Sequence, residues 1–303
     1  MSWRSVFISQ PARLSLHNNQ LLIKQDDAYS VPLEDIAVIV VDSREVVITA
    51  PLLSACAKYG VSLITCDESF MPCGQFLPFS QHSRFLKMLQ LQIGLPENFK
   101  AAIWQKIIQR KIEHQAFVLE TIGNNNGANY LKEIANSITS GDKENLEARA
   151  AHFYFPAIFG NKFSRKNENK INIRLNYAYA IIRAAVSRQI VAYGFLPALG
   201  LWHKSELNAF NLSDDLMEVF RPIVDLEIYT QLISGCLKDE FETTDKAKIV
   251  QILNYAIIFN QKKHAILSAM EQMIKSFSKA IVEQKIQYFQ LPQMTIAKEI
   301  EYE

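Results

Sequence analysis

The chain has 303 residues, 49% of them hydrophobic and 21% charged, which is typical of one or two well-packed globular domains and excludes a disordered chain. Its net charge of +1 neither indicates nor excludes a nucleic-acid partner, because local patches of charge decide such binding. The sequence contains no apolar run near the roughly 20 residues that cross a bilayer, which excludes a helical membrane protein.

Residues 1–77 have the pattern of a small β domain. Short runs rich in β-branched residues predict strands at 6–9, 12–16, 20–24, 36–42 and 61–65. Asn18 and Asn19 separate the second run from the third, and asparagine tolerates the positive φ of a tight hairpin turn. A helix is predicted over residues 49–59, with Gly60 directly after its end. We expect a sandwich-like sheet domain.

From about residue 78 onward, apolar residues recur at intervals of three and four, which indicates helices. The predicted helices cover residues 83–95, 98–122, 129–138, 145–159, 171–194, 225–234, 248–259 and 262–286. Residues 123–127 are expected to form a loop. The sequence therefore predicts an α+β multidomain protein in which a larger all-α domain, residues 78–303, follows the β domain.

The segment 197–225 combines a histidine with several carboxylates. His203 lies in a loop-like stretch, where functional residues are frequent. Asp214, Asp215 and Glu218 follow it, and acids three or four residues apart can share one helix face. One imidazole nitrogen and two carboxylate oxygens suit Mn²⁺ or Mg²⁺ better than a structural zinc ion.

Ordinary structural roles explain the same residues. Asn211 or Ser213 could cap a helix there, and acids in its first turn would complement the helix dipole. A loop histidine such as His203 is more often bonded to the backbone than to a metal. Arg221 could pair with Glu218 or with Glu206. The residues alone leave both explanations open.

Glu147 is a further candidate acid, on the predicted helix 145–159. Small residues lie on its face of that helix, so a substrate could come close to it. The commoner explanation is an exposed acid paired with Arg149 or Lys143, because charged residues on helices usually face solvent.

Basic and aromatic residues are interleaved over much of the predicted helical domain. Basic side chains neutralise phosphates and aromatic rings stack on bases, so this pattern is compatible with DNA binding, although most such runs are solvated faces. The candidate DNA contacts are Arg84, Lys162, Arg165, Lys166, Arg174 and Tyr177.

Motifs for other kinds of site are absent. The sequence has no phosphate-binding loop, dinucleotide fingerprint, nucleophile elbow or zinc-protease pair of histidines. The four cysteines form no CxxC pair and suit reduced core thiols in a cytoplasmic protein. We therefore expect a soluble, cytoplasmic protein without a membrane partner.

Three segments resemble the signature blocks of the CRISPR-associated integrase family, the catalytic subunit of the complex that inserts new spacers into CRISPR arrays. These blocks are residues 146–159, 171–203 and 211–225, and they follow the order and spacing of the family. The glutamate at position 218 is most like members from type II systems, in which the effector is a single large nuclease.

The resemblance implies a β domain used in dimerisation and a helical catalytic domain that binds metal and DNA. The metal ligands of the family fall on Glu147, His203 and Glu218, and Asp215 would support them or act as an occasional ligand. The cofactor would be Mg²⁺ or Mn²⁺. Many members have aspartate at the position of Glu218, so the geometry of this ligand stays open.

The resemblance also implies a reaction and partners. The 3′-hydroxyl ends of a spacer precursor duplex would be joined to the CRISPR repeat by transesterification, and water in place of the hydroxyl would give endonuclease activity. The partners would be DNA, a second copy of the chain and a small ferredoxin-like adaptation subunit that bridges two dimers. The alternatives are a stand-alone structure-specific DNA nuclease and a non-enzymatic helical DNA-binding scaffold.

Overall fold

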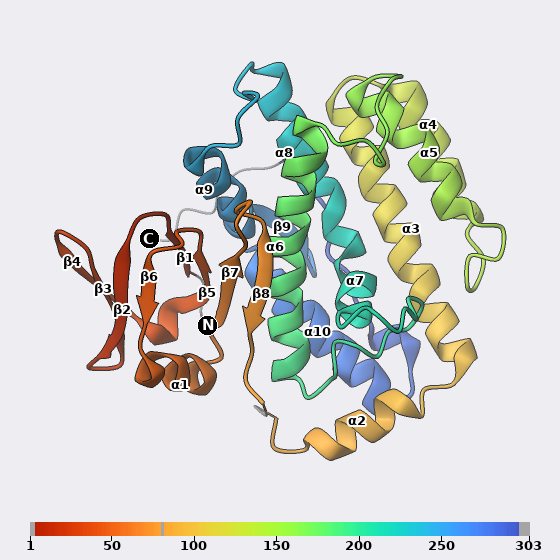
Figure 1. The fold of residues 1–303 in the computed structure, drawn as a ribbon. Helices are drawn as coiled ribbons and strands as arrows, with labels where there is room; N and C mark the ends of the chain where they lie inside the picture. Colours follow the sequence, from red (N-terminus) through yellow and green to blue (C-terminus); the bar gives the residue numbers. More distant parts are fainter. Residues whose placement is uncertain (1–3, 80–81, 297–303) are drawn as a thin grey trace.

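The computed structural model describes residues 4–79 and 82–296, in which a β-rich region precedes a mainly helical one (Figure 1). Within the described part, the β-rich region has two four-stranded sheets, of order β1-β5-β7-β8 and β4-β3-β2-β6. Their strands are β1 (Arg4–Ile8), β2 (Ala12–His17), β3 (Gln20–Lys24), β4 (Ala28–Pro32), β5 (Ile36–Val41), β6 (Val46–Ile48), β7 (Ser62–Cys66) and β8 (Pro72–Phe76), with the short 3₁₀ helix η1 (Leu33–Asp35) before β5. The predicted order of sheets and helices is confirmed.

Local sequence explains two connections in this region. The β2–β3 hairpin turns at Asn18 and Asn19, whose φ angles are 48° and 60°, as their position between two strand-like runs predicts. Helix α1 (Ala50–Tyr59) ends at Gly60 in the left-handed conformation, with a φ of 66°. Both predictions are confirmed.

Strand β5 is buried along its whole length and contributes to two cores. Ile39 and Val41 pack with α1 and the second sheet, whereas Val38 and Val40 belong to the core of the helical region. Alternate side chains of a strand point to opposite faces of its sheet, so both faces are covered. The sheet β1-β5-β7-β8 therefore lies between the second sheet and α6, which contacts β7 and β8 (Figure 1). The sandwich continues into the helical region without a solvated gap.

The helical region is arranged around α6, the long helix beside β8 (Figure 1). Its helices are α2 (Phe85–Ile93), α3 (Glu97–Thr121), α4 (Asn125–Ser137), α5 (Leu146–Phe159), α6 (Lys170–Ala192), α7 (Asn211–Met217), α8 (Arg221–Ile233), α9 (Thr243–Gln251) and α10 (Ile266–Glu283). The 3₁₀ helices are η2 (Glu218–Phe220), η3 (Ile252–Asn254) and η4 (Ile286–Tyr288). The stretch 123–127 was expected to be a loop, but α4 begins inside it because Asn124 caps the helix through Gly127 N–H.

The end of the predicted helix 248–259 and the start of the predicted helix 262–286 are wrong. Here the chain forms the hairpin β9 (Ala256–Phe259) and β10 (Lys262–Ala265). Asn260 and Gln261 turn it with φ angles of 50° and 64°. The region is therefore mostly helical, not all-α.

Two further features bear on the sequence predictions. Among the described residues, no helix has the length and apolar character needed to cross a membrane. The four cysteines are free thiols, as expected, but only two of them are buried or half-buried, whereas Cys73 and Cys236 are exposed. The expectation of core thiols is therefore wrong for these two.

Candidate active site

The carboxylates of Glu147 and Glu218 lie on either side of one ammonium group. Nζ of Lys111 is 2.6 Å from Oε1 of Glu147 and 2.6 Å from Oε2 of Glu218. Lys111 lies in the middle of α3, Glu147 in the first turn of α5, and Glu218 at the start of η2. Three segments that are far apart in sequence thus meet at one charge cluster.

Glu218 is almost completely buried, and each of its oxygens faces a cation. Nε of Arg221 is 2.7 Å from Oε1, so the predicted pairing of these two residues is confirmed. Burial alone would raise the pKa of Glu218, but the charges of Arg221 and Lys111 lower it below its ordinary value. Oε2 has no hydrogen-bond partner of acceptable angle among the described residues, although Lys111 is close.

Asp215 is fully buried and holds His203 in place. Its Oδ2 accepts hydrogen bonds from the N–H groups of Leu201 and Trp202, at 2.6 and 3.1 Å. Its Oδ1 accepts the N–H of His203 at 3.1 Å and lies 2.6 Å from Nδ1 of the same ring. A carboxylate only accepts, so Nδ1–H donates and Nε2 is left for another partner. The bond to Asp215 raises the pKa of His203.

The loop before α7 closes tightly around Asp215. A Cβ at Gly200 would lie 2.2 Å from the carbonyl oxygen of His203 and 3.0 Å from Oδ2 of Asp215, so only glycine fits here. The side-chain amide of Asn211 ties the loop together by donating to three backbone carbonyls, those of Ala198, Ser205 and Asn208.

The predicted capping role of Asn211 and Ser213 is therefore wrong. Helix α7 starts after Phe210 without a side-chain cap, and Asn211 is already its first residue. Ser213 is buried, and its hydroxyl is bonded to Ser187 on α6. The acids of this segment do not depend on a capped helix for their positions.

Asp142 places Glu147 by capping α5. Its two carboxylate oxygens accept the first two backbone N–H groups of α5, each at 2.9 Å. Arg149, a possible partner of Glu147, donates instead to the hydroxyl of Tyr130 at 2.9 Å. The cation beside Glu147 is Lys111, which the sequence pattern did not single out.

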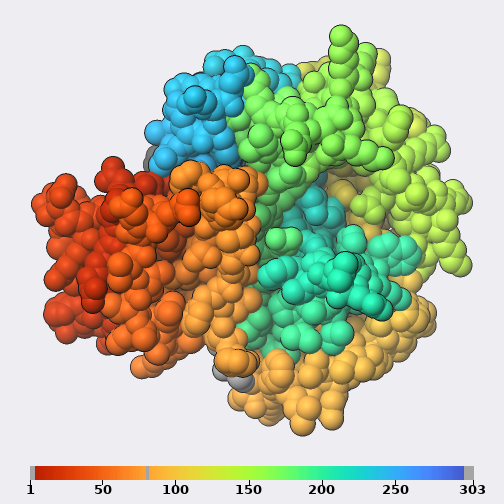
Figure 2. All heavy atoms as spheres, in the orientation of Figure 1, coloured from red at the N-terminus to blue at the C-terminus, as the bar shows by residue number. Residues whose placement is uncertain are grey.

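A cavity reaches Glu218, and a second cavity lies next to it; neither is lined by Glu147 or His203. One of about 200 Å³ is lined by Lys111, Gln115, Phe155, Arg165, Tyr179, Glu218, Arg221 and Asp225. A second of about 260 Å³ shares Arg165, Tyr179 and Arg221 with it and extends to Arg183. Figure 2 shows the surface hollowed between the green segment around α5 and the teal loop that precedes α7. The cavity beside Glu218 is therefore lined by two arginines, Arg165 and Arg221.

Four of the six candidate DNA contacts remain accessible. Arg84, Lys162 and Lys166 are exposed. Arg165 is half-buried, lines both cavities and donates to Oδ1 of Asn176 at 2.7 Å. These positions are compatible with phosphate contacts.

The other two candidates are buried, and we withdraw them as DNA contacts. Arg174 is 0% exposed, and its guanidinium lies 3.2 Å from the carboxylate of Asp245. Tyr177 is also 0% exposed and packs edge-on against Phe241. Both residues face α9 and its preceding loop, so their role is structural.

A family comparison decides what kind of protein carries this site. The family model for the CRISPR associated protein Cas1 matches residues 6–256. The chain belongs to the Cas1 family. It is 46% identical to the CRISPR-associated endonuclease Cas1 of Neisseria meningitidis serogroup C (strain 8013), over 100% of both chains. The predicted enzyme, a Cas1 endonuclease and integrase of CRISPR spacer acquisition, is confirmed, and a non-enzymatic scaffold is excluded.

Solved structures show the same fold at low sequence identity. A chain of a Cas6-RT-Cas1–Cas2 complex matches with a TM-score of 0.76 and 17% identity, over 95% of this chain and 36% of that chain. A casposase bound to integration product matches with a TM-score of 0.74 and 18% identity, over 94% of this chain and 92% of that chain. The β-then-α architecture is therefore that of Cas1.

The donor groups at the candidate site are of the kind that binds a hard divalent cation. The described residues contain no group of three or more His, Cys, Asp or Glu already arranged around a metal position. Glu147 and Glu218 nevertheless converge on one cation, the ammonium of Lys111. The buried Oε2 of Glu218 accepts no hydrogen bond from the described residues, so it is available to bind a metal. The bond to Asp215 raises the pKa of His203, and the charge of Glu218 acts in the same direction. Two carboxylates and an imidazole suit Mg²⁺ or Mn²⁺.

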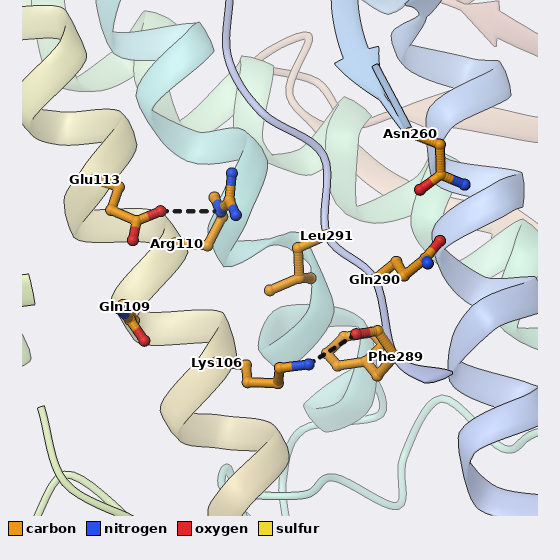
Figure 3. Close-up of a pocket in the computed structure, with 8 residues that line it drawn as sticks. All are labelled: Lys106, Gln109, Arg110, Glu113, Asn260, Phe289, Gln290 and Leu291. Carbon is orange, nitrogen blue, oxygen red and sulfur yellow. Dashed lines mark hydrogen bonds and ion pairs between the residues drawn. The ribbon is translucent and has the colours of Figure 1, made fainter. Parts of the chain in front are cut away.

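Another cavity, of about 330 Å³, lies between α3 and residues 289–291 (Figure 3). Nζ of Lys106 donates there to the carbonyl of Phe289 at 3.0 Å, and Arg110 pairs with Glu113 at 3.1 Å. Its cations thus already have partners, and none of the predicted metal ligands lines it. The carboxylate cluster remains the candidate site.

Proposed function

We propose that this chain is a metal-dependent integrase that joins 3′-hydroxyl ends of a spacer precursor duplex to the CRISPR repeat, with Glu147, His203 and Glu218 as metal ligands. One observation carries the proposal: Glu147 and Glu218 converge on a single cation, the ammonium of Lys111. Asp215 separately fixes the ring of His203. The glutamate at position 218 and the full-length identity to the Neisseria protein support a place among type II members.

Each residue of the site has a separate role in phosphoryl transfer. When bound, Mg²⁺ or Mn²⁺ supplies positive charge against the charge that develops on the phosphate. Asp215 binds Nδ1 of His203, so Nε2 is the ring nitrogen that would bind the metal. Arg165 and Arg221, which line the cavity beside Glu218, provide donors for phosphate oxygens.

The chemistry exchanges one phosphodiester for another. The 3′-hydroxyl oxygen of the spacer end forms a bond to phosphorus, and the bond from phosphorus to the 3′-oxygen of the target strand breaks. The proton of the attacking hydroxyl is released, and the leaving oxygen takes up a proton. The number of phosphodiester bonds is unchanged, so no ATP is consumed. Water in place of the hydroxyl gives strand cleavage.

Partners follow from the same proposal. The casposase in the matching structure is bound to an integration product, and another matching chain comes from a complex that contains Cas2. These likenesses support DNA, a small ferredoxin-like Cas2-type subunit and a second copy of this chain as partners, with the β-rich region as the dimer interface. Sedimentation equilibrium of the full chain tests the dimer, and a monomer at micromolar concentration would contradict it.

A joining assay tests the reaction. The chain, its small partner subunit and Mn²⁺ should join a short duplex to a repeat-containing plasmid. Dideoxy ends should abolish joining and leave plasmid nicking intact. Glu147→Gln and His203→Ala should abolish both activities, whereas Glu144→Gln, an exposed acid one turn earlier, should not. Joining by dideoxy-ended DNA would rule out the strand-transfer chemistry, and cleavage of branched DNA without any joining would favour a stand-alone nuclease.

A further inference from the structure

Lys111 occupies the centre of the carboxylate cluster. It is buried, and its ammonium lies 2.6 Å from one oxygen of Glu147 and 2.6 Å from one oxygen of Glu218. Without it, the buried carboxylate of Glu218 and the half-buried carboxylate of Glu147 would face each other unpaired, and like charges repel. Lys111 is therefore the group that lets Glu147 and Glu218 stand together in the absence of metal.

The same position conflicts with a bound divalent cation. The buried oxygen of Glu218 that faces Lys111 lacks a hydrogen bond, and its other oxygen is paired with Arg221. A metal that joins Glu147 to Glu218 has to use the space between them, which the ammonium fills. A doubly charged ion and an ammonium cannot share that space, so one displaces the other.

We propose that Lys111 is a built-in counter-ion that holds the metal ligands together and competes with the metal for them. This inference rests on the proposed metal site. Its ammonium keeps Glu147 and Glu218 in place while the site is free of metal, and it moves aside when Mg²⁺ or Mn²⁺ binds.

The side chain of Lys111 is suited to this exchange. It carries its charge as a compact group on a flexible four-carbon stem, so Nζ can move without a change in the backbone. The cavity of about 200 Å³ that adjoins Lys111 and Glu218 gives it room, and Arg165 also lines this cavity. A substrate phosphate in this cavity would pair with the displaced ammonium of Lys111.

The experiment measures Mn²⁺ binding by calorimetry and the melting temperature in EDTA, both on the full chain without DNA. Lys111→Met should bind Mn²⁺ more tightly than the unmodified protein, by about tenfold or more, and should melt at a lower temperature in EDTA. Saturating Mn²⁺ should restore most of that loss. Lys111→Gln, which keeps a donor but removes the charge, should also tighten binding if Lys111→Met does not fold.

Matched variants separate this inference from the proposed function. Lys106→Met removes a lysine from the same helix that donates only to backbone carbonyls, so it should lower the melting temperature and leave Mn²⁺ affinity unchanged. Equal or weaker Mn²⁺ binding by the folded Lys111 variants would overturn the counter-ion role. Unchanged Mn²⁺ binding by Glu147→Gln and His203→Ala would instead overturn the metal site itself.

Discussion

Asp215 binds His203 twice, through the ring Nδ1 at 2.6 Å and through the backbone N–H at 3.1 Å. Four hydrogen bonds in total end on its carboxylate, which is fully buried. Ring orientation and loop shape are thus set by one side chain. The position of the imidazole depends on the charge and on the acceptor capacity of that side chain.

Asp215→Asn should weaken Mn²⁺ binding and joining by about 10- to 100-fold. The new NH₂ group cannot accept, so it faces N–H donors, and the ring of His203 loses its fixed tautomer. Calorimetry and the joining assay measure the two effects. Asp214→Asn is the control, because Asp214 accepts from Asn208 and does not contact His203. Equal losses in both variants would show that Asp215 acts only through the stability of α7.

Arg174→Met should lower the free energy of unfolding by about 3–5 kcal/mol. The guanidinium of Arg174 is completely buried and pairs with Asp245, so its removal leaves an uncompensated buried charge. Urea denaturation measures the loss. The salt dependence of DNA binding by the folded protein should stay unchanged, and a shallower dependence would return Arg174 to the set of DNA contacts.

Lys162→Ala should reduce the salt dependence of DNA binding and leave the stability almost unchanged. Lys162 is exposed on the segment after α5, and removal of one phosphate contact reduces the slope of log affinity against log salt by about 1. Stability should change by less than about 0.5 kcal/mol. DNA binding between low and moderate salt, measured by fluorescence anisotropy, provides the slope. An unchanged slope would place the DNA path away from Lys162.

The sequence predicts those parts of the fold that depend on local chemistry. The asparagine hairpin and the glycine after α1 were found because φ > 0 restricts residue type. The β9–β10 hairpin was missed because a short apolar run such as 256–259 suits a strand or a helix equally. Its turn residues, Asn260 and Gln261, were the signal that could have shown it.

The site was predictable only in part. The family resemblance selected Glu147, His203 and Glu218, but it says nothing of Lys111, because pairing across helices is a tertiary property. A lysine between Ile108 and Ile112 on the buried side of α3 was the available signal. Arg174 was misassigned because helical periodicity does not tell which face of α6 meets a neighbouring helix.

Lys246→Met should destabilise the β-rich and helical regions together, so that they still unfold in a single transition. Nζ of Lys246 on α9 lies 3.0 Å from the carboxylate of Asp42 after β5, and both side chains are buried. The loss should be about 3–5 kcal/mol, and replacement of both partners by apolar residues should recover much of it. The denaturation curves should show one transition by near-UV and far-UV dichroism. Two separated transitions would mean that residues 1–77 unfold independently.

His114 should make stability depend on pH. Its ring is fully buried, Nδ1 lies 2.7 Å from the carbonyl of Val219, and Nε2 accepts the N–H of Met294. Burial lowers its pKa from 6.5 to about 3. The unfolded chain therefore binds a proton between these values that the folded protein does not, and stability falls as the pH falls through this window.

The size of the effect distinguishes His114 from the other titrating groups. Its contribution to the free energy of unfolding should decrease by about 1.4 kcal/mol per pH unit below pH 6. His114→Gln keeps a donor and an acceptor but cannot be protonated, so its stability should fall less steeply between pH 6 and pH 4. His152→Gln, at an exposed position on α5, should keep the original slope. Parallel curves for the two variants in urea denaturation would show that His114 is already charged in the folded protein. In that case, its ring could not accept the Met294 N–H that secures the C-terminal segment beside η2.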